Sequence, residues 1–177
     1  MTLLLTNQKV LLRKKLLLSV LSKANVVNGR KKLQKMIYLT NILGWDVFND
    51  FRFHLYGPYS DHLYYEIQNL IEAKMIEEVK TGESYSYSIT EKGKSLLEVL
   101  NSKKNNLEDK TNNLVGKLDG YSSEDLEIMA SLYYISNEFN EISYDEMVEE
   151  LLERKPYLYK DKVWQALEIF DIMNTFS

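Results

Sequence analysis

Residues 51–63 read Phe-Arg-Phe-His-Leu-Tyr-Gly-Pro-Tyr-Ser-Asp-His-Leu, and they form the approach to a predicted helix. Gly57-Pro58 is a strong turn signal, and Ser60 is a residue type that caps helix N-termini. From residue 60 to residue 73, apolar side chains recur at helical spacing, at Leu63, Ile67, Leu70 and Ile71.

Two short strands are predicted directly after this helix. Residues 75–80 and 84–89 are joined by Thr81-Gly82-Glu83, and in the second run Tyr85, Tyr87 and Ile89 alternate with serines. A helix followed by such a hairpin is typical of a winged helix-turn-helix. Residues 60–73 would then be the recognition helix, and the hairpin would be the wing.

The upstream chain predicts two more helices. The first covers residues 8–23 with Asn7 as its N-cap, residues 25–29 form a break, and the second covers residues 31–43 and stops at Gly44. Periodicity places one stripe of the second helix inside, namely Leu33, Met36, Ile37, Thr40 and Leu43. It leaves another set facing solvent: Lys31, Lys32, Lys35, Tyr38 and Asn41.

The downstream chain predicts a helical extension. Thr90 caps a helix that completes a winged-helix domain over residues 1–100, and residues 101–120 form a polar helical connector. Leucines spaced by seven across residues 97–118 also fit a dimerisation helix, so a homodimer through this seam is an alternative. Residues 121–177 predict three further helices, the first two starting at Ser122 and Ser143. The fold class is therefore mainly α with a small β-hairpin.

Composition narrows the class of protein. The 177 residues contain no cysteine, which fits a reducing cytoplasm, and the apolar run at residues 16–21 is far shorter than the ~18 residues that identify a membrane span. The net charge of −4 conceals an asymmetry, because residues 1–45 carry nine basic and no acidic side chains. We expect a cytoplasmic protein with a basic N-terminal region.

The reactive side chains show no pattern that is typical of a catalytic or metal site. The two histidines, His54 and His62, are eight residues apart and lack the spacing of a metal site. Glycine-rich phosphate loops and a Gly-x-Ser-x-Gly elbow are also missing from the sequence. We therefore expect no catalytic residues, no metal, no cofactor and no enzymatic activity.

Binding is the remaining prediction. The face that would read bases or contact a partner consists of Tyr59, His62, Tyr65, Gln68 and Asn69. The residues expected to contact DNA phosphates are Lys9, Arg13, Arg30, Lys31, Lys32, Lys35 and Lys80. The carboxylates of Asp61, Glu66 and Glu72 on the same recognition helix would oppose phosphates.

Three segments carry a family resemblance. They are residues 29–38 (Gly-Arg-Lys-Lys-Leu-Gln-Lys-Met-Ile-Tyr), 53–60 (Phe-His-Leu-Tyr-Gly-Pro-Tyr-Ser) and 85–93 (Tyr-Ser-Tyr-Ser-Ile-Thr-Glu-Lys-Gly). Over roughly residues 8–95 the chain resembles the YwgA family of uncharacterised prokaryotic proteins. More distantly, it is similar to the Panacea domain, an antitoxin domain that includes SocA-like proteins and that usually has a hydrophobic residue where Tyr59 stands.

The resemblance implies a winged-helix-like fold and, through the Panacea relation, the neutralising or adapting of a protein partner such as a toxin. Two hypotheses follow. The leading hypothesis is a DNA-binding transcriptional regulator, and the alternative is an antitoxin-like or adaptor module that binds a protein.

Overall fold

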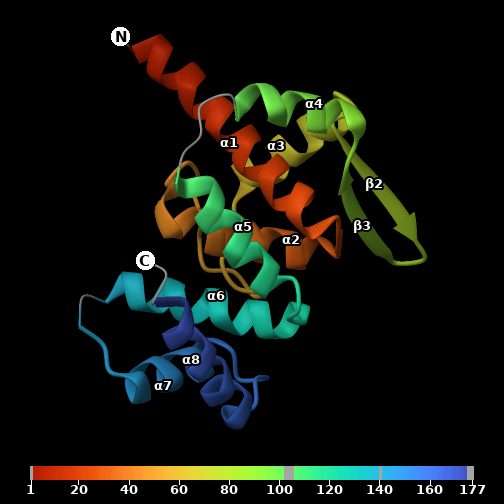
Figure 1. Cartoon of the computed structure of the whole chain (residues 1–177). Helices are drawn as coiled ribbons and strands as arrows, with labels where there is room; N and C mark the ends of the chain where they lie inside the picture. The colour runs from red at the N-terminus through yellow and green to blue at the C-terminus, as the bar shows by residue number, and fades with distance from the viewer. Residues whose placement is uncertain (1, 102–105, 140, 175–177) are drawn as a thin grey trace.

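A computed structural model describes residues 2–101, 106–139 and 141–174. These residues form a mainly helical molecule with a small antiparallel sheet, and the β2–β3 hairpin projects from the helical body (Figure 1). The elements in chain order are α1 (Thr2–Ala24), β1 (Val26–Asn28), α2 (Arg30–Thr40), the π-helical turn η1 (Asn41–Trp45), α3 (Asp61–Glu72), β2 (Ile76–Thr81), β3 (Ser84–Ile89), α4 (Glu91–Leu100), α5 (Asn106–Leu118), α6 (Ser123–Glu138), α7 (Tyr144–Arg154) and α8 (Lys160–Asn174).

Helix α3 forms as predicted. The Ser60 hydroxyl accepts a hydrogen bond from the Leu63 amide at 2.9 Å, and Leu63, Ile67 and Leu70 are buried. Thr90 likewise caps α4, and Ser122 and Ser143 form capping boxes at the starts of α6 and α7. Local side-chain chemistry therefore sets these four helix starts.

The sheet has one strand more than predicted. Residues 25–29, expected to be a break, contain β1, which pairs antiparallel with β3 so that Val27 lies opposite Tyr87. An isolated two-stranded hairpin is marginal in water, and β1 supplies the partner that makes β3 a central strand. Tyr87 is buried as a result.

The first two helices differ from their predicted limits. Helix α1 begins at Thr2, so Asn7 lies inside it and is not its N-cap, because no glycine or proline interrupts the preceding residues. Helix α2 passes into η1, and the chain leaves that turn through Asp46 in the left-handed region. The Asn41 amide holds this exit by bonding the backbone of Val47 and Phe48, and so Asn41 is buried.

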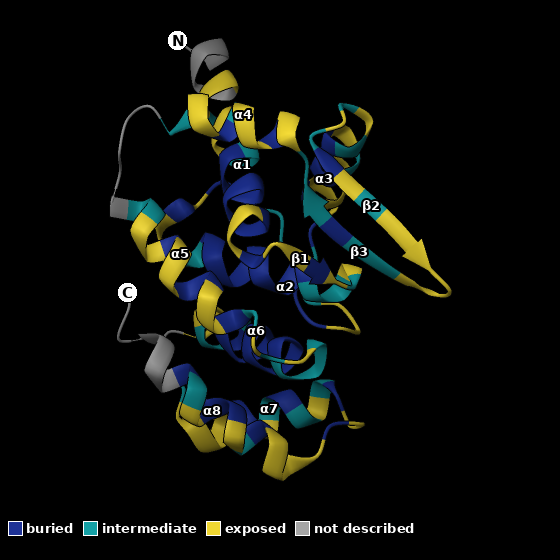
Figure 2. Ribbon diagram, turned by 45° about the vertical axis from the view of Figure 1, so that its right-hand side comes forward, coloured by how far each residue is buried: buried dark blue, intermediate teal, exposed yellow. Residues whose placement is uncertain are grey.

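The predicted outer face of α2 is covered. Lys35, Tyr38 and Asn41 were expected to face solvent, but all three are buried. Helix α6 packs across Lys35 and Tyr38, and the loop at Val47 and Phe48 covers Asn41. A helical wheel assigns one buried stripe to a helix, whereas α2 lies between α1 on one side and α6 on the other. Figure 2 shows both α2 and α6 as largely buried helices at the centre of the molecule.

Helix α5 also belongs to the core. It packs against α1, and Leu114, Val115 and Leu118 are buried there within the chain. Leu114 and Leu118 had been assigned to the dimer seam, so this part of the predicted seam is not a free surface. The join between α4 and α5 falls on residues 102–105, which lie outside the described residues.

Two of the three C-terminal helices, α7 (Tyr144–Arg154) and α8 (Lys160–Asn174), form a layer beyond α6. Helices α7 and α8 pack against α6 on the side away from α1, and their outer faces are exposed (Figure 2). One continuous cluster of buried apolar residues extends from Leu16 in α1 to Phe170 in α8. Within the described ranges, no helix has both the length and the hydropathy that crossing a bilayer would require.

Candidate functional site

Two of the sequence motifs meet between α2 and the loop before α3. Gln34 in α2 uses its side-chain amide to bond the Ser60 backbone, with its nitrogen 3.2 Å from the Ser60 carbonyl oxygen. The next residue, Lys35, donates from Nζ to the Pro58 carbonyl at 2.6 Å. Helix α2 therefore fixes the position of the Gly-Pro loop through the loop's own backbone.

The loop itself is a tight turn. His54 and Gly57 exchange backbone hydrogen bonds, and Arg52 pairs with Tyr59 as an isolated bridge. Gly57 has φ +81°, and a Cβ at this position would lie 2.8 Å from the Ser131 hydroxyl oxygen. Both the backbone conformation and the lack of space explain why glycine stands here.

A buried ionic cluster joins the loop to the C-terminal helices. Glu127 of α6, whose side chain is 2% exposed, accepts from Lys155 at 2.6 Å and from Lys31 at 2.9 Å. Lys155, which is fully buried, also donates to the Leu55 carbonyl, and the Tyr157 hydroxyl donates to Glu127. Burial raises the pKa of Glu127, but the bonds from Lys155, Tyr157 and Lys31 outweigh it and hold the pKa below its usual value.

Lys35 lies beside this cluster and differs from Lys155. Lys35 is 2% exposed, yet no carboxylate oxygen among the described residues lies within 4 Å of its Nζ. Its one hydrogen bond goes to the Pro58 carbonyl. Burial lowers the pKa of the Lys35 ammonium to about 7; the charge of Glu127 opposes this shift, and the charges of Lys155 and Lys31 add to it. Two ammonium groups, those of Lys31 and Lys155, thus share the Glu127 carboxylate, and Lys35 lies near them without a contact to it.

Above Lys35 the surface opens into two adjoining pockets, which we name together the tyrosine groove. The lysine pocket has a volume of about 470 Å³ and is lined by Arg30, Lys31, Gln34, Lys35, His54, Tyr56, Gly57 and Tyr59. The helix pocket has a volume of about 180 Å³ and is lined by Arg30, Leu33, Gln34, Tyr59, Tyr64, Ile67, Gln68 and Tyr87. Arg30, Gln34 and Tyr59 line both pockets, so the two pockets form one continuous surface.

Arg30 stands where the two pockets meet, and the sheet holds it. Its Nε donates to the Tyr87 hydroxyl at 3.0 Å, and its guanidinium lies 3.7 Å from the centre of the Tyr85 ring. Glu78 on β2 accepts from the Tyr87 hydroxyl and lies 3.6 Å from the guanidinium. The β2–β3 hairpin therefore orients a cation at the mouth of the groove.

The chain is 38% identical over 86 residues to the uncharacterized protein YwgA of Bacillus subtilis (strain 168). This chain is similar to YwgA. The match covers 46% of this chain and 52% of YwgA, so the chain spans about half the length of the curated relative it matches. No protein-family model matches the chain.

The predicted resemblance to YwgA is confirmed, whereas the more distant one to the Panacea domain stays a prediction. The three segments that carried the YwgA resemblance come together in the tyrosine groove: Gln34 and Lys35 come from the first, Tyr56 to Tyr59 from the second, and Tyr87 from the third. YwgA is itself an uncharacterized protein, so the function has to be inferred from the site.

The residues predicted to contact phosphates do not make one free basic face. Lys31 pairs with Glu127, Lys32 with Asp119 and Arg30 with Glu78, while Lys35 is buried. Arg13 donates to the Val47 carbonyl at 2.8 Å. Lys9 in α1 and the exposed Lys80 on β2 have no ion pair among the described residues.

The predicted reading face is divided. His62, Tyr65 and Asn69 are exposed on α3, and Tyr65 is 62% exposed. Gln68 and Tyr59 instead line the tyrosine groove. Glu127, Lys155 and Tyr157 were not predicted from the sequence, and no local signal could have found them, because they lie between 72 and 102 positions from Leu55 in the loop that they hold.

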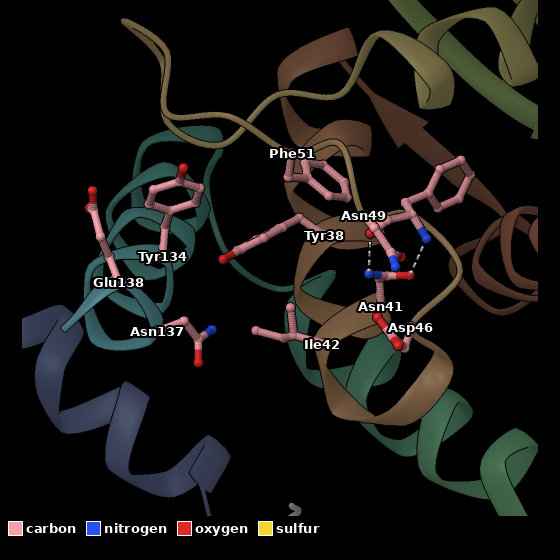
Figure 3. A pocket seen from close by; sticks show the side chains of 10 residues that line it. Tyr38, Asn41, Ile42, Asp46, Asn49, Phe51, Tyr134, Asn137 and Glu138 are labelled. Atoms are coloured by element: carbon pink, nitrogen blue, oxygen red, sulfur yellow. Dashed lines mark hydrogen bonds between the residues drawn. The ribbon is translucent and has the colours of Figure 1, made fainter. Parts of the chain in front are cut away.

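A second cleft lies between η1 and α6. It has a volume of about 530 Å³, and in Figure 3 Tyr38 extends from one wall toward Tyr134 and Asn137 on the other. Asn41 lies at the base, where its amide is already bonded to Phe48. Neutral amides and tyrosines dominate this lining, so it lacks the concentration of cations that marks the tyrosine groove.

Proposed function

We propose that this protein is a non-catalytic binding module that holds an acidic segment of a protein partner in the tyrosine groove. The main support is that residues from the three segments that resemble YwgA meet at two adjoining pockets. Tyrosines form the walls of these pockets, and cations lie at their floor and rim. Tyrosine and arginine are the residue types that dominate binding energy at protein interfaces. A cytoplasmic location belongs to the same proposal.

Charge determines the kind of segment. Arg30, Lys31 and Lys35 all line the lysine pocket, and no carboxylate lines it. Glu127 and Glu78 neutralise these cations in part, but they are fewer in number and lie outside the lining. A segment that carries Asp or Glu beside an apolar residue complements both the charge and the walls.

The same arrangement favours a protein over a duplex. A nucleic acid needs several free cations at the spacing of successive phosphates, and each phosphate contact releases counterions. Here four of the seven residues predicted to contact DNA phosphates pair with carboxylates or are buried. Helix α3 also presents the exposed Asp61 and Glu72, whose carboxylates would repel phosphates. A concave pocket suits an inserted side chain better than it suits a rod-like duplex.

DNA binding by a winged helix-turn-helix remains the second candidate, because one observation favours it. Helices α2 and α3 precede a projecting hairpin in the order that the motif requires, and α3 exposes His62, Tyr65 and Asn69. Lys80 on the hairpin would then meet the phosphate backbone. As a transcriptional regulator the protein would use α3, whereas as an antitoxin-like or adaptor module it would use the groove.

The test separates the two surfaces. Fluorescent peptides in which Glu alternates with Tyr or Leu are titrated by anisotropy, each beside the same peptide with Gln in place of Glu. We expect only the acidic peptides to bind. The variant Tyr59→Ala should weaken their binding by about thirtyfold, as the loss of an interface hot spot does, whereas Tyr159→Ala should leave it unchanged.

Tyr159 is a matched control, since it is an exposed tyrosine outside both pockets. Equal binding of the acidic and amide peptides, or equal loss in the two variants, would contradict the proposal. Retention of a random duplex pool at low salt that is lost on Lys80→Glu but kept in Tyr59→Ala would favour the regulator.

A further inference from the structure

We propose that the lysine pocket is a carboxylate site, in which a carboxylate on an aromatic or other apolar body becomes the counter-ion of Lys35. This inference rests on the proposed function for the source of the group, which is an acidic residue of the partner segment. A free small carboxylic acid has the same chemistry and is the other source to be distinguished.

Cations outnumber carboxylates below the pocket. Lys31 and Lys155 both contact the Glu127 carboxylate, which leaves Lys35 without an ion pair among the described residues. A buried charge is costly unless it is paired. An anion that enters the pocket meets a cation already desolvated by the fold, so their attraction is less screened than it is in water.

Hydrogen-bond donors that are not used within the protein also favour an anion in this pocket. An ammonium has three donors, and Lys35 uses one of them, on Pro58. Gln34, the other buried polar side chain of the lining, is engaged on both its amide atoms by Ser60. Lys35 therefore keeps two N–H donors for a ligand at the floor of the pocket, compared with one on Gln34 Nε2.

The walls indicate the body that carries the carboxylate. Tyr56, Tyr59 and His54 are aromatic, and the His54 and Tyr59 rings lie 6.0 Å apart between centroids. The Lys31 ammonium lies 5.3 Å from the centre of the Tyr56 ring, so one wall is itself a cation on an aromatic face. Aromatic rings accommodate a flat or apolar group, and the cations orient its acid.

Proton linkage follows from the same geometry. A carboxylate beside Lys35 favours the charged ammonium and raises its pKa, so binding takes up a proton where free Lys35 is partly neutral. Affinity should then fall as the pH rises above about 7. The titratable or charged groups facing Lys35 are Glu127 from α6, Lys155 and Tyr157 after α7, Arg30 and Lys31 from α2, and His54, Tyr56 and Tyr59 from the loop.

The experiment uses benzoate as the probe and benzamide as its neutral isostere, with the lysine side-chain signals of the full chain followed by NMR. We expect benzoate to shift the Lys35 signals and benzamide to leave them in place. Lys35→Met should weaken benzoate binding by about tenfold or more, the size of a lost charged hydrogen bond. Lys94→Met on α4, an exposed lysine outside both pockets, should bind benzoate as the parent protein does.

A pH series supplies a second readout. Between pH 6 and pH 9 benzoate affinity should fall by about tenfold in the parent protein, and this dependence should vanish in Lys35→Met. If Lys35→Met does not fold, Lys31→Met, which removes a half-buried cation of the same pocket, should lower the affinity by severalfold. Binding of benzamide as strong as that of benzoate, or a Lys35 signal that benzoate does not move, would overturn the proposal.

Competition with the acidic peptides distinguishes the two sources. Displacement of the peptide by benzoate places the peptide carboxylate in the lysine pocket. Benzoate binding without displacement identifies a site for a free acid and removes the proposed partner segment from this pocket. Peptide binding that Lys35→Met leaves unchanged overturns the carboxylate site while the proposed function stands.

Discussion

Lys155 and Lys35, the most deeply buried lysines among the described residues, differ in their counter-ions. Lys155 is enclosed by a carboxylate, a backbone carbonyl and a phenol, which together satisfy its three donors. Lys35 has a single carbonyl partner. Lys155 with Glu127 therefore holds the loop in place, while Lys35 is available to a ligand.

At the residue scale, Glu127→Gln tests whether the ion pair between Lys155 and Glu127 stabilises the fold. The substitution leaves Lys155 buried without its counter-ion, and breaking a buried pair in this way costs roughly 3 kcal/mol in the free energy of unfolding. Urea denaturation at pH 7 measures the difference. Glu124→Gln removes an exposed partner of Lys162 and should change the free energy of unfolding by less than about 0.5 kcal/mol.

The pH dependence of that difference has a definite sign. The folded state lowers the pKa of Glu127, so its contribution to stability is present above the unfolded pKa and is lost as the pH falls through the folded value. The gap between the parent protein and Glu127→Gln should therefore narrow under acid conditions. A gap that stays constant from neutral to acid pH would contradict the assigned ion pair.

At the scale of elements, the junction between the hairpin and α4 depends on close backbone approach. A Cβ at Gly93 would lie 2.2 Å from the Met75 carbonyl oxygen and 2.8 Å from Ile89 Cγ1. Thr90 closes the same junction by donating to the Lys74 carbonyl while it caps α4. Gly93 therefore sets how closely α4 packs against the hairpin.

Gly93→Ala should destabilise the protein by about 2 kcal/mol or more, because backbone cannot move aside as a flexible side chain can. Gly116→Ala in α5 is the matched control. Its Cβ would meet Lys23 Cε at an ordinary 3.5 Å, and alanine in a helix should stabilise by about 0.5–1 kcal/mol. Thermal unfolding of both variants tests the prediction, and melting temperatures that shift in the same direction would refute it.

At the scale of the whole molecule, α6 is shared between two layers. One face covers α2, and the other carries α7 and α8. The Glu127 cluster and the continuous buried apolar cluster both cross this boundary. We therefore expect the predicted N-terminal and C-terminal units to unfold as one cooperative body.

The two tryptophans test this expectation separately. Trp45 is buried in η1 and donates from Nε1 to Thr111, while Trp164 lies in α8. Trp164→Phe and Trp45→Phe each leave one tryptophan as the fluorescent reporter. In urea, the unfolding transition seen by each reporter should coincide with the transition seen by far-UV circular dichroism, once any change in stability caused by the substitution is corrected for. Separate midpoints for the two reporters would establish independent domains instead.

The sequence by itself determined the features that depend on neighbouring residues. Serine and threonine caps set the starts of α3, α4, α6 and α7, and alternation in residues 84–89 set the hairpin, because both signals act within a few positions. Part of the tyrosine groove was also identifiable, since five of its residues were predicted as contact residues, namely Arg30, Lys31, Lys35, Tyr59 and Gln68. Nothing in the sequence indicated that they line one groove.

Only the tertiary structure decided what those residues do. Periodicity placed Lys35 and Tyr38 in solvent, yet α6 packs over them, and the third strand forms because β3 gains a partner from residues 26–28. Glu127 and Lys155 carry no local signal and reach the loop through folding. Burial and pairing depend on segments far apart in the chain, so three of the seven basic residues that suggested a DNA surface, Arg30, Lys31 and Lys35, line a pocket.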